Sequence, residues 1–483
     1  MQSPGYYNRV TDSASSEPKA PGGIRAFIAQ HPTASAVTVA AVLFALLAGV
    51  AVFAGISVGS ANSAADVPPD EVTAEQRSQP DAIPGAVAVR TCSVDPLATA
   101  ASFPSLVGVV TDVASGDVLW GRSADKASSP AHIVTAFTAA AALQTLGADT
   151  RISTKVVDGS KPGSIVLVGG GDPTLATTNA SFYRDAPQIS DLASQAMTRY
   201  DELHSGVPLT EIVLDSTLWT TADAWDASWP ERERTGGYHS YVTALMVNGD
   251  RADPTLAISP RGTDPVKSAG QAFAQAAGLP AVTFSTGAAV GSTVLAEVKS
   301  QPVSVLVEQM LISGDDSIAE SLARLVSKKA GLSGAASTLT QAMQGALSDA
   351  GLSDTDAITI ADGSGLSPNN QVPPLVVAQF MAKGADGDGA IGAAFSMLPI
   401  GGKSGDLYNR FEGDAAAASG QVAAKSGWTN QEHSLGGVVN AEDGTKLAFA
   451  FYAIGEGIST DARTALDNLV AGVYACGGNL SNY

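Results

Sequence analysis

The chain has few side chains suited to metal or redox chemistry and few positive charges. Its 483 residues include 2 cysteines and 5 histidines, and 27 lysines and arginines stand against 47 aspartates and glutamates, for a net charge of −20. Two cysteines exclude a four-thiolate zinc site and a disulfide-dense scaffold, and no two histidines have metal-ligand spacing, so we expect no metal and no other cofactor. The acidic balance excludes nucleic-acid binding by bulk attraction to phosphates.

Apolar residues are plentiful, at 45% of the chain, and they are concentrated near the N-terminus. Residues 34–58 contain no charged side chain, and about 20 apolar residues suffice for a helix to cross a bilayer. Cations precede this segment and acidic residues follow it, which predicts a single-pass membrane anchor with the C-terminal part outside the cytoplasm. The alternative is a signal peptide cleaved near Ser63-Ala64-Ala65, which would make the protein secreted.

The flanking segments have compositions of their own. Residues 1–33 are rich in Ser, Pro, Gly and Ala and predict a disordered cytoplasmic tail, and residues 59–90 predict an extended acidic linker outside the cell. The folded part then begins near Cys92, and the second cysteine is Cys476. An oxidising exterior favours a disulfide between them, which would tie the two ends of the folded part together; two unrelated thiols are the alternative.

The folded part has the pattern of an α+β protein with a mainly antiparallel sheet covered by helices. A hairpin opens it, helices occupy the middle, and a three-stranded meander and a final helix close it. The helix at 131–146 is apolar on nearly every face and therefore belongs in a core. The expected strands are 106–110, 118–120, 422–426, 435–440 and 447–454, and the expected helices are 131–146, 302–311, 317–329 and 460–474.

Five short motifs then resemble, in order and spacing, the class C low-molecular-mass penicillin-binding proteins, the serine D-alanyl-D-alanine carboxypeptidases and endopeptidases of peptidoglycan. They are Leu167–Leu175, Ala244–Arg251, Asp362–Ser367, Leu398–Gly405 and Ala424–Gly427. The resemblance implies a penicillin-binding/β-lactamase-like transpeptidase domain built from residues 91–154 and 296–483. It also implies an inserted second domain at 155–295.

The family's catalytic pattern is altered at two of its three parts. The family places a serine nucleophile and a lysine base in Ser-x-x-Lys, but the corresponding positions here are His132 and Thr135. The family's Ser-x-Asn corresponds to Gly314 and Asp316, and a shift by one residue to Ser313 still lacks the asparagine. Because nucleophile and base act as a unit, we expect acylation of the family type to be lost.

The third part of the pattern is present as Lys425-Ser426-Gly427, which in the family binds the terminal carboxylate of the substrate. Lys425 is then either a retained carboxylate-binding group or an ordinary solvated lysine of a strand. A nearby Asp316 could also neutralise it.

His132 and Thr135 share a helical face, so a histidine-activated threonine is one hypothesis for residual catalysis. The simpler hypothesis is that His132 fills the cleft and Thr135 caps a backbone carbonyl. In the inserted segment, four aromatic residues form either a recognition surface or a small core: Trp219, Trp225, Trp229 and Tyr238.

These observations favour a catalytically impaired relative of the D-Ala-D-Ala carboxypeptidases that acts in the cell envelope. It would hold peptidoglycan stem peptides or a cell-wall synthesis protein rather than hydrolyse a substrate. An active carboxypeptidase or endopeptidase with a divergent site, and a purely structural envelope protein, are the alternatives.

Overall fold

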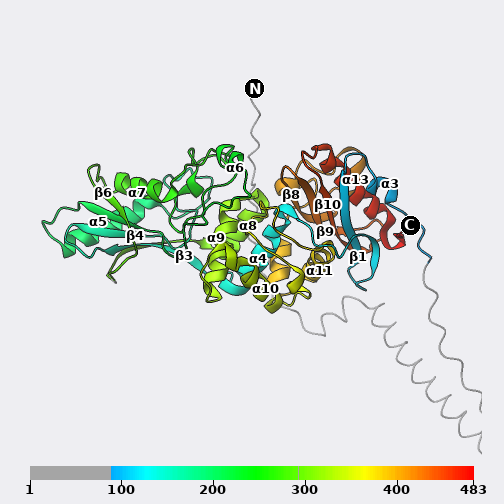
Figure 1. Cartoon of the computed structure of the whole chain (residues 1–483), viewed down its shortest axis with the longest axis horizontal. Coiled ribbons are helices and arrows are strands. Elements are labelled where there is room, and N and C mark those ends of the chain that lie inside the picture. The colour runs from blue at the N-terminus through cyan, green and yellow to red at the C-terminus, as the bar shows by residue number, and fades with distance from the viewer. Residues whose placement is uncertain (1–88, 292, 483) are drawn as a thin grey trace, which may run out of the picture. The chain divides into compact units, whose positions relative to one another are not determined.

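The computed structural model describes residues 89–291 and 293–482 (Figure 1). The predicted tail at 1–33, the predicted anchor at 34–58 and nearly all of the predicted linker at 59–90 lie outside these ranges. Within the described ranges, no helix is both long enough and apolar enough to cross a bilayer.

A five-stranded antiparallel sheet brings the first strands of the described part together with the last (Figure 1). In β1, Ser105 lies opposite Ile454 and Asp112 lies opposite Leu447 in β10. The predicted hairpin and the predicted meander are confirmed. In spatial order the strands are β2 (Val118–Arg122), β1 (Ser105–Asp112), β10 (Lys446–Ile454), β9 (Glu432–Asn440) and β8 (Val422–Trp428).

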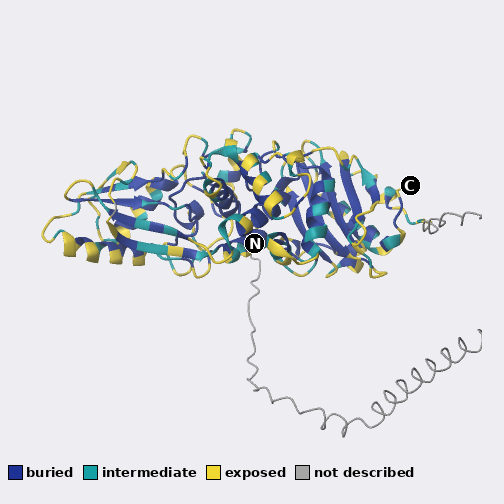
Figure 2. Cartoon of the chain, turned by 90° about the horizontal axis from the view of Figure 1, so that it is seen from below, coloured by how far each residue is buried: buried dark blue, intermediate teal, exposed yellow. Residues whose placement is uncertain are grey.

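Side chains alternate between the two faces of this sheet, as the period of a strand requires. Val107 and Val109 of β1 pack into the core formed with the central helices. Leu106 and Val110 pack on the opposite face, against the C-terminal helix α13 (Asp461–Cys476). The sheet is therefore covered on both faces, and buried residues run along its strands in Figure 2.

The predicted all-apolar helix is confirmed and lies at the centre of the helical layer. A 3-10 turn at Ala131–Ile133 leads into α4 (Val134–Leu146), in which every residue from Val134 to Leu143 is buried. Helix α4 contacts α8, α9, α10 and α12, and α11 covers one face of the sheet at β1, β9 and β10. These helices are α8 (Val303–Ser313), α9 (Asp316–Lys329), α10 (Leu339–Asp349), α11 (Pro374–Ala385) and α12 (Gly389–Ser396).

A second five-stranded sheet, of mixed direction, has its own hydrophobic core. It spans Arg151 to Pro302, close to the segment 155–295 predicted as an insertion, and α5 (Ile189–Leu203) and α7 (Pro265–Ala276) pack against it. Strands β4, β5 and β6 are parallel, whereas β3 is antiparallel to both of its neighbours. In spatial order the strands are β6 (Thr283–Thr286), β5 (Glu211–Asp215), β4 (Ser164–Val168), β3 (Arg151–Asp158) and β7 (Val294–Pro302).

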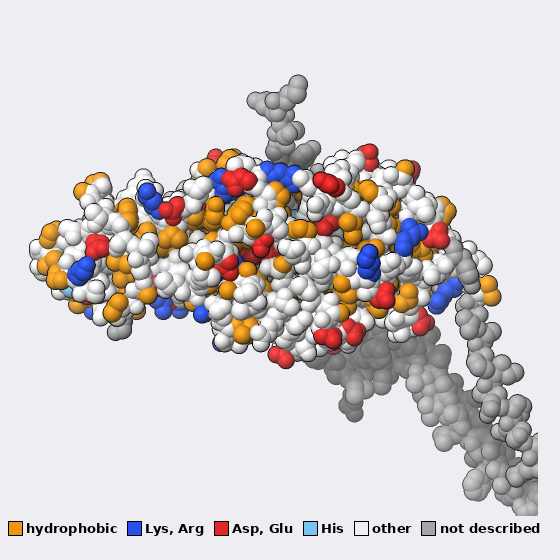
Figure 3. Space-filling view, viewed as in Figure 1, with side chains coloured by type: hydrophobic (Ala, Val, Ile, Leu, Met, Phe, Trp, Pro, Cys, Tyr) orange, Lys and Arg blue, Asp and Glu red, His pale blue; other side chains and the backbone are white. Residues whose placement is uncertain are grey.

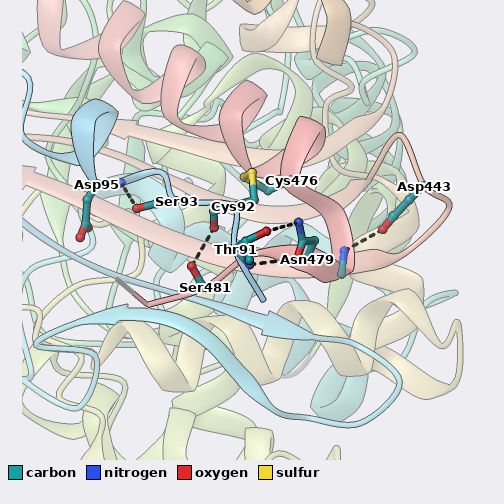
Figure 4. The surroundings of a disulfide bond; sticks show 9 residues. Thr91, Cys92, Ser93, Asp95, Asp443, Cys476, Asn479 and Ser481 are labelled. Atoms are coloured by element: carbon teal, nitrogen blue, oxygen red, sulfur yellow. Dashed lines mark hydrogen bonds between the residues drawn. A yellow bond between two sulfur atoms is a disulfide. The ribbon is translucent and has the colours of Figure 1, made fainter. Parts of the chain in front are cut away.

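A disulfide joins Cys92 to Cys476, the pairing favoured by the sequence (Figure 4). The backbone around it is also paired, because the carbonyl of Cys92 accepts hydrogen bonds from the Ser481 amide and hydroxyl, at 2.8 and 3.0 Å. The amide of Thr91 donates to Asn479 Oδ1 at 3.0 Å. The two ends of the described part are thereby held together beside the first sheet.

We expect the double substitution Cys92→Ala/Cys476→Ala to lower the free energy of unfolding by about 2–4 kcal/mol, because the bond closes a loop of 384 residues in the unfolded chain. Chemical denaturation followed by tryptophan fluorescence measures this. Equal unfolding midpoints for the wild type and the double variant would contradict it, as would two free thiols detected in the wild type by mass spectrometry.

Candidate functional site

Residue 132, which the sequence comparison of motifs predicts to be the position of the family nucleophile, is presented by an unusual backbone turn at the start of the central helix. The preceding Ala131 has a left-handed conformation with φ of 47°, which costs a non-glycine residue about 1–3 kcal/mol and persists only where surrounding structure enforces it. The hydroxyl of Ser434 in β9 donates to the carbonyl of Pro130 at 2.7 Å and fixes the turn from one side.

Two motif glycines enforce the turn from the other sides. A Cβ atom on Gly427 would lie 2.7 Å from the amide nitrogen of His132, and one on Gly365 would lie 2.1 Å from the carbonyl oxygen of Ala131. Only a residue without a side chain allows either segment to approach so closely. The Asp362–Ser367 and Ala424–Gly427 motifs are therefore explained by the packing that positions residue 132.

The side chain at this position pairs with an acidic residue of the second motif. His132 Nε2 lies 3.5 Å from Asp316 Oδ1, and the two side chains are 16% and 6% exposed. Burial lowers the pKa of His132, but the charge of Asp316 raises it, and the net result is a pKa above the usual value. The imidazole is thereby biased towards its cationic form.

Thr135 does not face the cleft. Its side chain is buried and its hydroxyl donates to the carbonyl of His132 at 2.7 Å. The simpler hypothesis, in which Thr135 caps a backbone carbonyl, is confirmed, and the hydroxyl is turned away from any position where His132 could activate it.

The turn carrying Gly314 and Asp316 is held by the inserted segment. Gly314 ends α8 in a left-handed conformation, and Asp315 caps α9 by accepting from the Ile318 amide at 3.0 Å. The other oxygen of Asp315 accepts from Arg251 Nη2 at 2.8 Å, in an ion pair whose side chains are only 3% and 1% exposed. Despite burial, the charge of Arg251 holds the pKa of Asp315 below its usual value.

The Ala244–Arg251 motif is explained by this ion pair. Three successive residues before the arginine, Asn248, Gly249 and Asp250, have positive φ angles of 55°, 56° and 58°. Asn, Gly and Asp are the residue types that adopt this conformation most readily. The turn directs Arg251 into the second motif, where Tyr183 Oη also accepts from Arg251 Nη1 at 2.6 Å.

The third motif contains a buried cation whose partner the sequence did not predict. Lys425 is 1% exposed, so it is not a solvated strand lysine, and its Nζ donates to Asp406 Oδ2 at 2.6 Å. The hydroxyl of Ser426 donates to the same oxygen at 2.7 Å. The neutralisation suggested for Asp316 is thus performed by Asp406, while Asp316 faces His132. Asp406 directly follows the Leu398–Gly405 motif, and this position in the sequence could have identified it as a site residue.

Two buried acids support the loop that contacts Ala131. Asp362 accepts from the amides of Gly365 and Ser367 at 2.8 and 2.6 Å and so shapes the loop around Gly365. Glu320 accepts from the Ser364 amide at 2.8 Å. Burial and the neighbouring charge of Asp362 raise the pKa of Glu320 to about 8.

The aromatic residues of the inserted segment have divided roles. Trp219 and Trp229 are 2% and 4% exposed and form a small core, and Trp229 Nε1 donates to Asp362 at 2.8 Å. Tyr238 is 41% exposed and its ring meets that of Trp428 edge-on at 6.0 Å. Since Trp428 directly follows Gly427, this pair joins the inserted segment to the third motif.

His239 lies near the site, although its position in the sequence did not predict this. It is fully buried, with its ring centre 4.4 Å from that of Trp229, and it interacts electrostatically with Asp316 and His132. Burial lowers the pKa of His239 to about 4, so it is neutral at physiological pH. It does not line the cavity, and it adds no charge beside it.

Residues from the three motif positions and from the inserted segment enclose a cavity of about 230 Å³. All three motifs contribute to its lining, with Thr135 excluded, and so does the inserted segment. On the face shown in Figure 3, blue and red side chains are interspersed among white and orange ones, and several of opposite charge lie next to one another. No cluster of three or more potential metal ligands exists within residues 89–291 and 293–482. The predicted site residues that line the cavity are His132, Gly314, Asp316, Lys425, Ser426 and Gly427.

Residues 93–277 and 255–473 match the D-Ala-D-Ala carboxypeptidase 3 (S13) family. The chain belongs to this family. It is 33% identical to Carboxypeptidase DacB of Mycolicibacterium smegmatis over 456 residues, which cover 91% of this chain and 96% of that protein. It is 27% identical to a D-alanyl-D-alanine carboxypeptidase of Actinomadura over 449 residues, which cover 75% of this chain and 80% of that protein. The predicted membership of the class C low-molecular-mass penicillin-binding proteins is confirmed.

Among solved structures, this S13-family chain is similar to penicillin binding protein 4 from Haemophilus influenzae. The TM-score is 0.64 at 18% identity, over 81% of this chain and 99% of the other. At that identity the likeness concerns the fold, and it confirms the predicted penicillin-binding-protein-like α+β architecture.

We expect Arg251→Met to lower the free energy of unfolding by about 3–5 kcal/mol, because it leaves the buried carboxylate of Asp315 without its counter-charge. Arg199→Met is the matched control, since Arg199 and Glu202 form an exposed pair of the kind that contributes only about 0–1 kcal/mol. Denaturant unfolding of both variants tests this. Equal losses in the two variants would rule out a special role for the buried pair.

We expect Asp316→Asn to lower the pKa of His132, because burial then acts without the opposing anion. In the wild type, the raised pKa means that protonated His132 stabilises the fold below pH 6.5, and this contribution is lost as the pH rises through the folded-state pKa. An NMR titration of the His132 ring protons measures the shift. Asp201→Asn on the exposed surface is the control, and an unchanged pKa in Asp316→Asn would refute the assignment.

Proposed function

We propose that this chain is a penicillin-binding-protein-like member of the cell envelope that binds peptidoglycan stem peptides, or a cell-wall synthesis protein, without hydrolysing them. The names of its relatives describe carboxypeptidases, and its fold and motif positions are those of that family. We further propose that residues 34–58 anchor it in the membrane with the described part outside, or direct its secretion if they are cleaved.

The observation that carries the proposed loss of catalysis is the chemistry at residue 132. A family-type acylation needs a hydroxyl there and a basic amine one helical turn further on. His132 supplies an imidazole paired with Asp316, and Thr135 supplies a hydroxyl committed to a backbone carbonyl. Losing a nucleophile and its base costs on the order of 10⁶ in rate in a well-studied serine protease.

The geometry that remains supports binding. The motif glycines close on residue 132, and the three motif positions line a cavity of about 230 Å³. Tyr238 and Trp428 both line the cavity, and their rings are half-exposed and meet edge-on. Half-exposed aromatic rings of this kind are typical of binding surfaces.

Covalent labelling with a fluorescent penicillin, together with D-alanine release from a pentapeptide stem, tests the catalytic part of the proposal. We expect neither stoichiometric label nor D-alanine release from the full chain, with the Actinomadura D-alanyl-D-alanine carboxypeptidase as the active control. Stoichiometric labelling or release at a rate comparable with that control would overturn the proposal in favour of an active enzyme with a divergent site.

Co-sedimentation with purified peptidoglycan tests the binding part. We expect Tyr238→Ala to reduce retention several-fold, because Tyr238 lines the cleft, whereas Tyr408→Ala is the matched control at an exposed tyrosine outside the lining. Equal retention of both variants and the wild type would remove the cleft from the interaction.

A further inference from the structure

Asp406 occupies the two groups that would otherwise receive a ligand's carboxylate. One of its oxygens, Oδ2, accepts from Lys425 Nζ at 2.6 Å and from the Ser426 hydroxyl at 2.7 Å. These are the lengths of charge-assisted hydrogen bonds, which are about twice as strong as neutral ones. The carboxylate of Asp406 thus takes the place in this cleft that the family pattern assigns to the end of a substrate.

Lys425 and Ser426 have few hydrogen-bond donors left for a second anion. A serine hydroxyl has one proton to donate, and that of Ser426 is directed at Asp406. Of the three Lys425 protons, one is directed at Asp406 and another at the Ser426 carbonyl, 3.0 Å away. At Lys425 and Ser426, an incoming carboxylate would therefore find one donor and, beside it, the negative charge of Asp406.

The backbone that carries Asp406 is fixed in position. It lies in the 3-10 turn Gly405–Leu407, in which Leu407 is fully buried and Gly405 has a φ of 57°. A Cβ on Gly405 would lie 2.9 Å from Pro399, so the turn is closely packed. A little further along, Arg410 forms two hydrogen bonds, of 2.8 and 2.7 Å, with Asp467 in α13.

Removing the charge of Asp406 would leave Lys425 without its carboxylate partner. Lys425 has a side chain only 2% exposed, so it cannot turn to water for a replacement. Arg463 also lines the cavity and lies in the fields of Asp467 and Asp406, and its guanidinium forms no hydrogen bond or ion pair in the described part of the chain. Arg410 is already neutralised by Asp467.

We propose that Asp406 determines which peptides this cleft accepts: it excludes a free terminal carboxylate and leaves the cleft to peptide segments without one, such as amidated ends or internal, cross-linked peptide. This inference rests on the proposed binding function and names its ligand class. In this role Asp406 is a specificity-determining residue that acts through Lys425 and Ser426.

Calorimetric titration of the full chain with one stem pentapeptide, prepared as the free acid and as the C-terminal amide, tests the proposal. For the wild type we expect the acid to bind no more tightly than the amide. For Asp406→Asn, which keeps the shape and one acceptor, we expect the acid to bind at least about tenfold more tightly than the amide, equivalent to about 1.4 kcal/mol. Asp414→Asn, at an exposed aspartate outside the cavity, should behave as the wild type.

A second variant and an unfolding measurement distinguish a change in peptide specificity from a change in folding. Adding Ser426→Ala to Asp406→Asn should abolish the gain for the acid, and thermal unfolding should show both variants folded. The inference is overturned if the wild type already prefers the acid tenfold. It is also overturned if Asp406→Asn binds the acid and the amide equally well, or binds neither peptide. Failure of the wild type to bind any peptide or peptidoglycan, with the acid preference still gained in Asp406→Asn, would instead refute the proposed function alone.

Discussion

The buried ion pair between Arg251 and Asp315 is the contact on which the arrangement of the cleft depends. Asp315 caps α9 and Arg251 comes from the inserted segment, so this one pair sets the position of the second motif relative to the second sheet. Breaking a buried ion pair leaves an uncompensated charge in a medium that solvates it poorly, which makes the alternative arrangements costly. Asp316, the next residue, is thereby held where its carboxylate meets His132.

The charged side chains at the three motif positions are each paired with another residue of the cleft. Each charged group on the family's three motif positions has its own protein partner: His132 with Asp316, and Lys425 with Asp406. A catalytic site of this family needs an unpaired hydroxyl and a basic amine at its centre. Paired charges in their place stabilise the empty cleft and lower its attraction for a charged ligand.

The scaffold around residue 132 and the chemistry at residue 132 are separable. The left-handed Ala131, the close approaches of Gly365 and Gly427, and the hydrogen bond from Ser434 retain a turn shaped to present a side chain into the cleft. These features cost free energy to maintain, and they concern backbone packing rather than reactive groups. Under the proposed binding function, this turn presents a shaped surface to a ligand.

Much of the architecture followed from the sequence alone, because it depends on local periodicity. The alternation of apolar residues predicted β8, β9 and β10, and the apolar run of α4 predicted a helix inside a core. The motif glycines located the cleft, since only glycine permits those close approaches. The sequence pattern also predicted that His132 and Thr135 stand where the family has its serine and lysine. The partners of the charged side chains were decided by tertiary structure: His132 and Asp316 are far apart in the chain, and Asp406 reaches Lys425 from a separate loop. Periodicity reports which face of an element is buried, whereas an ion pair depends on the path of each loop in three dimensions, and that path is set by the packing of the whole domain.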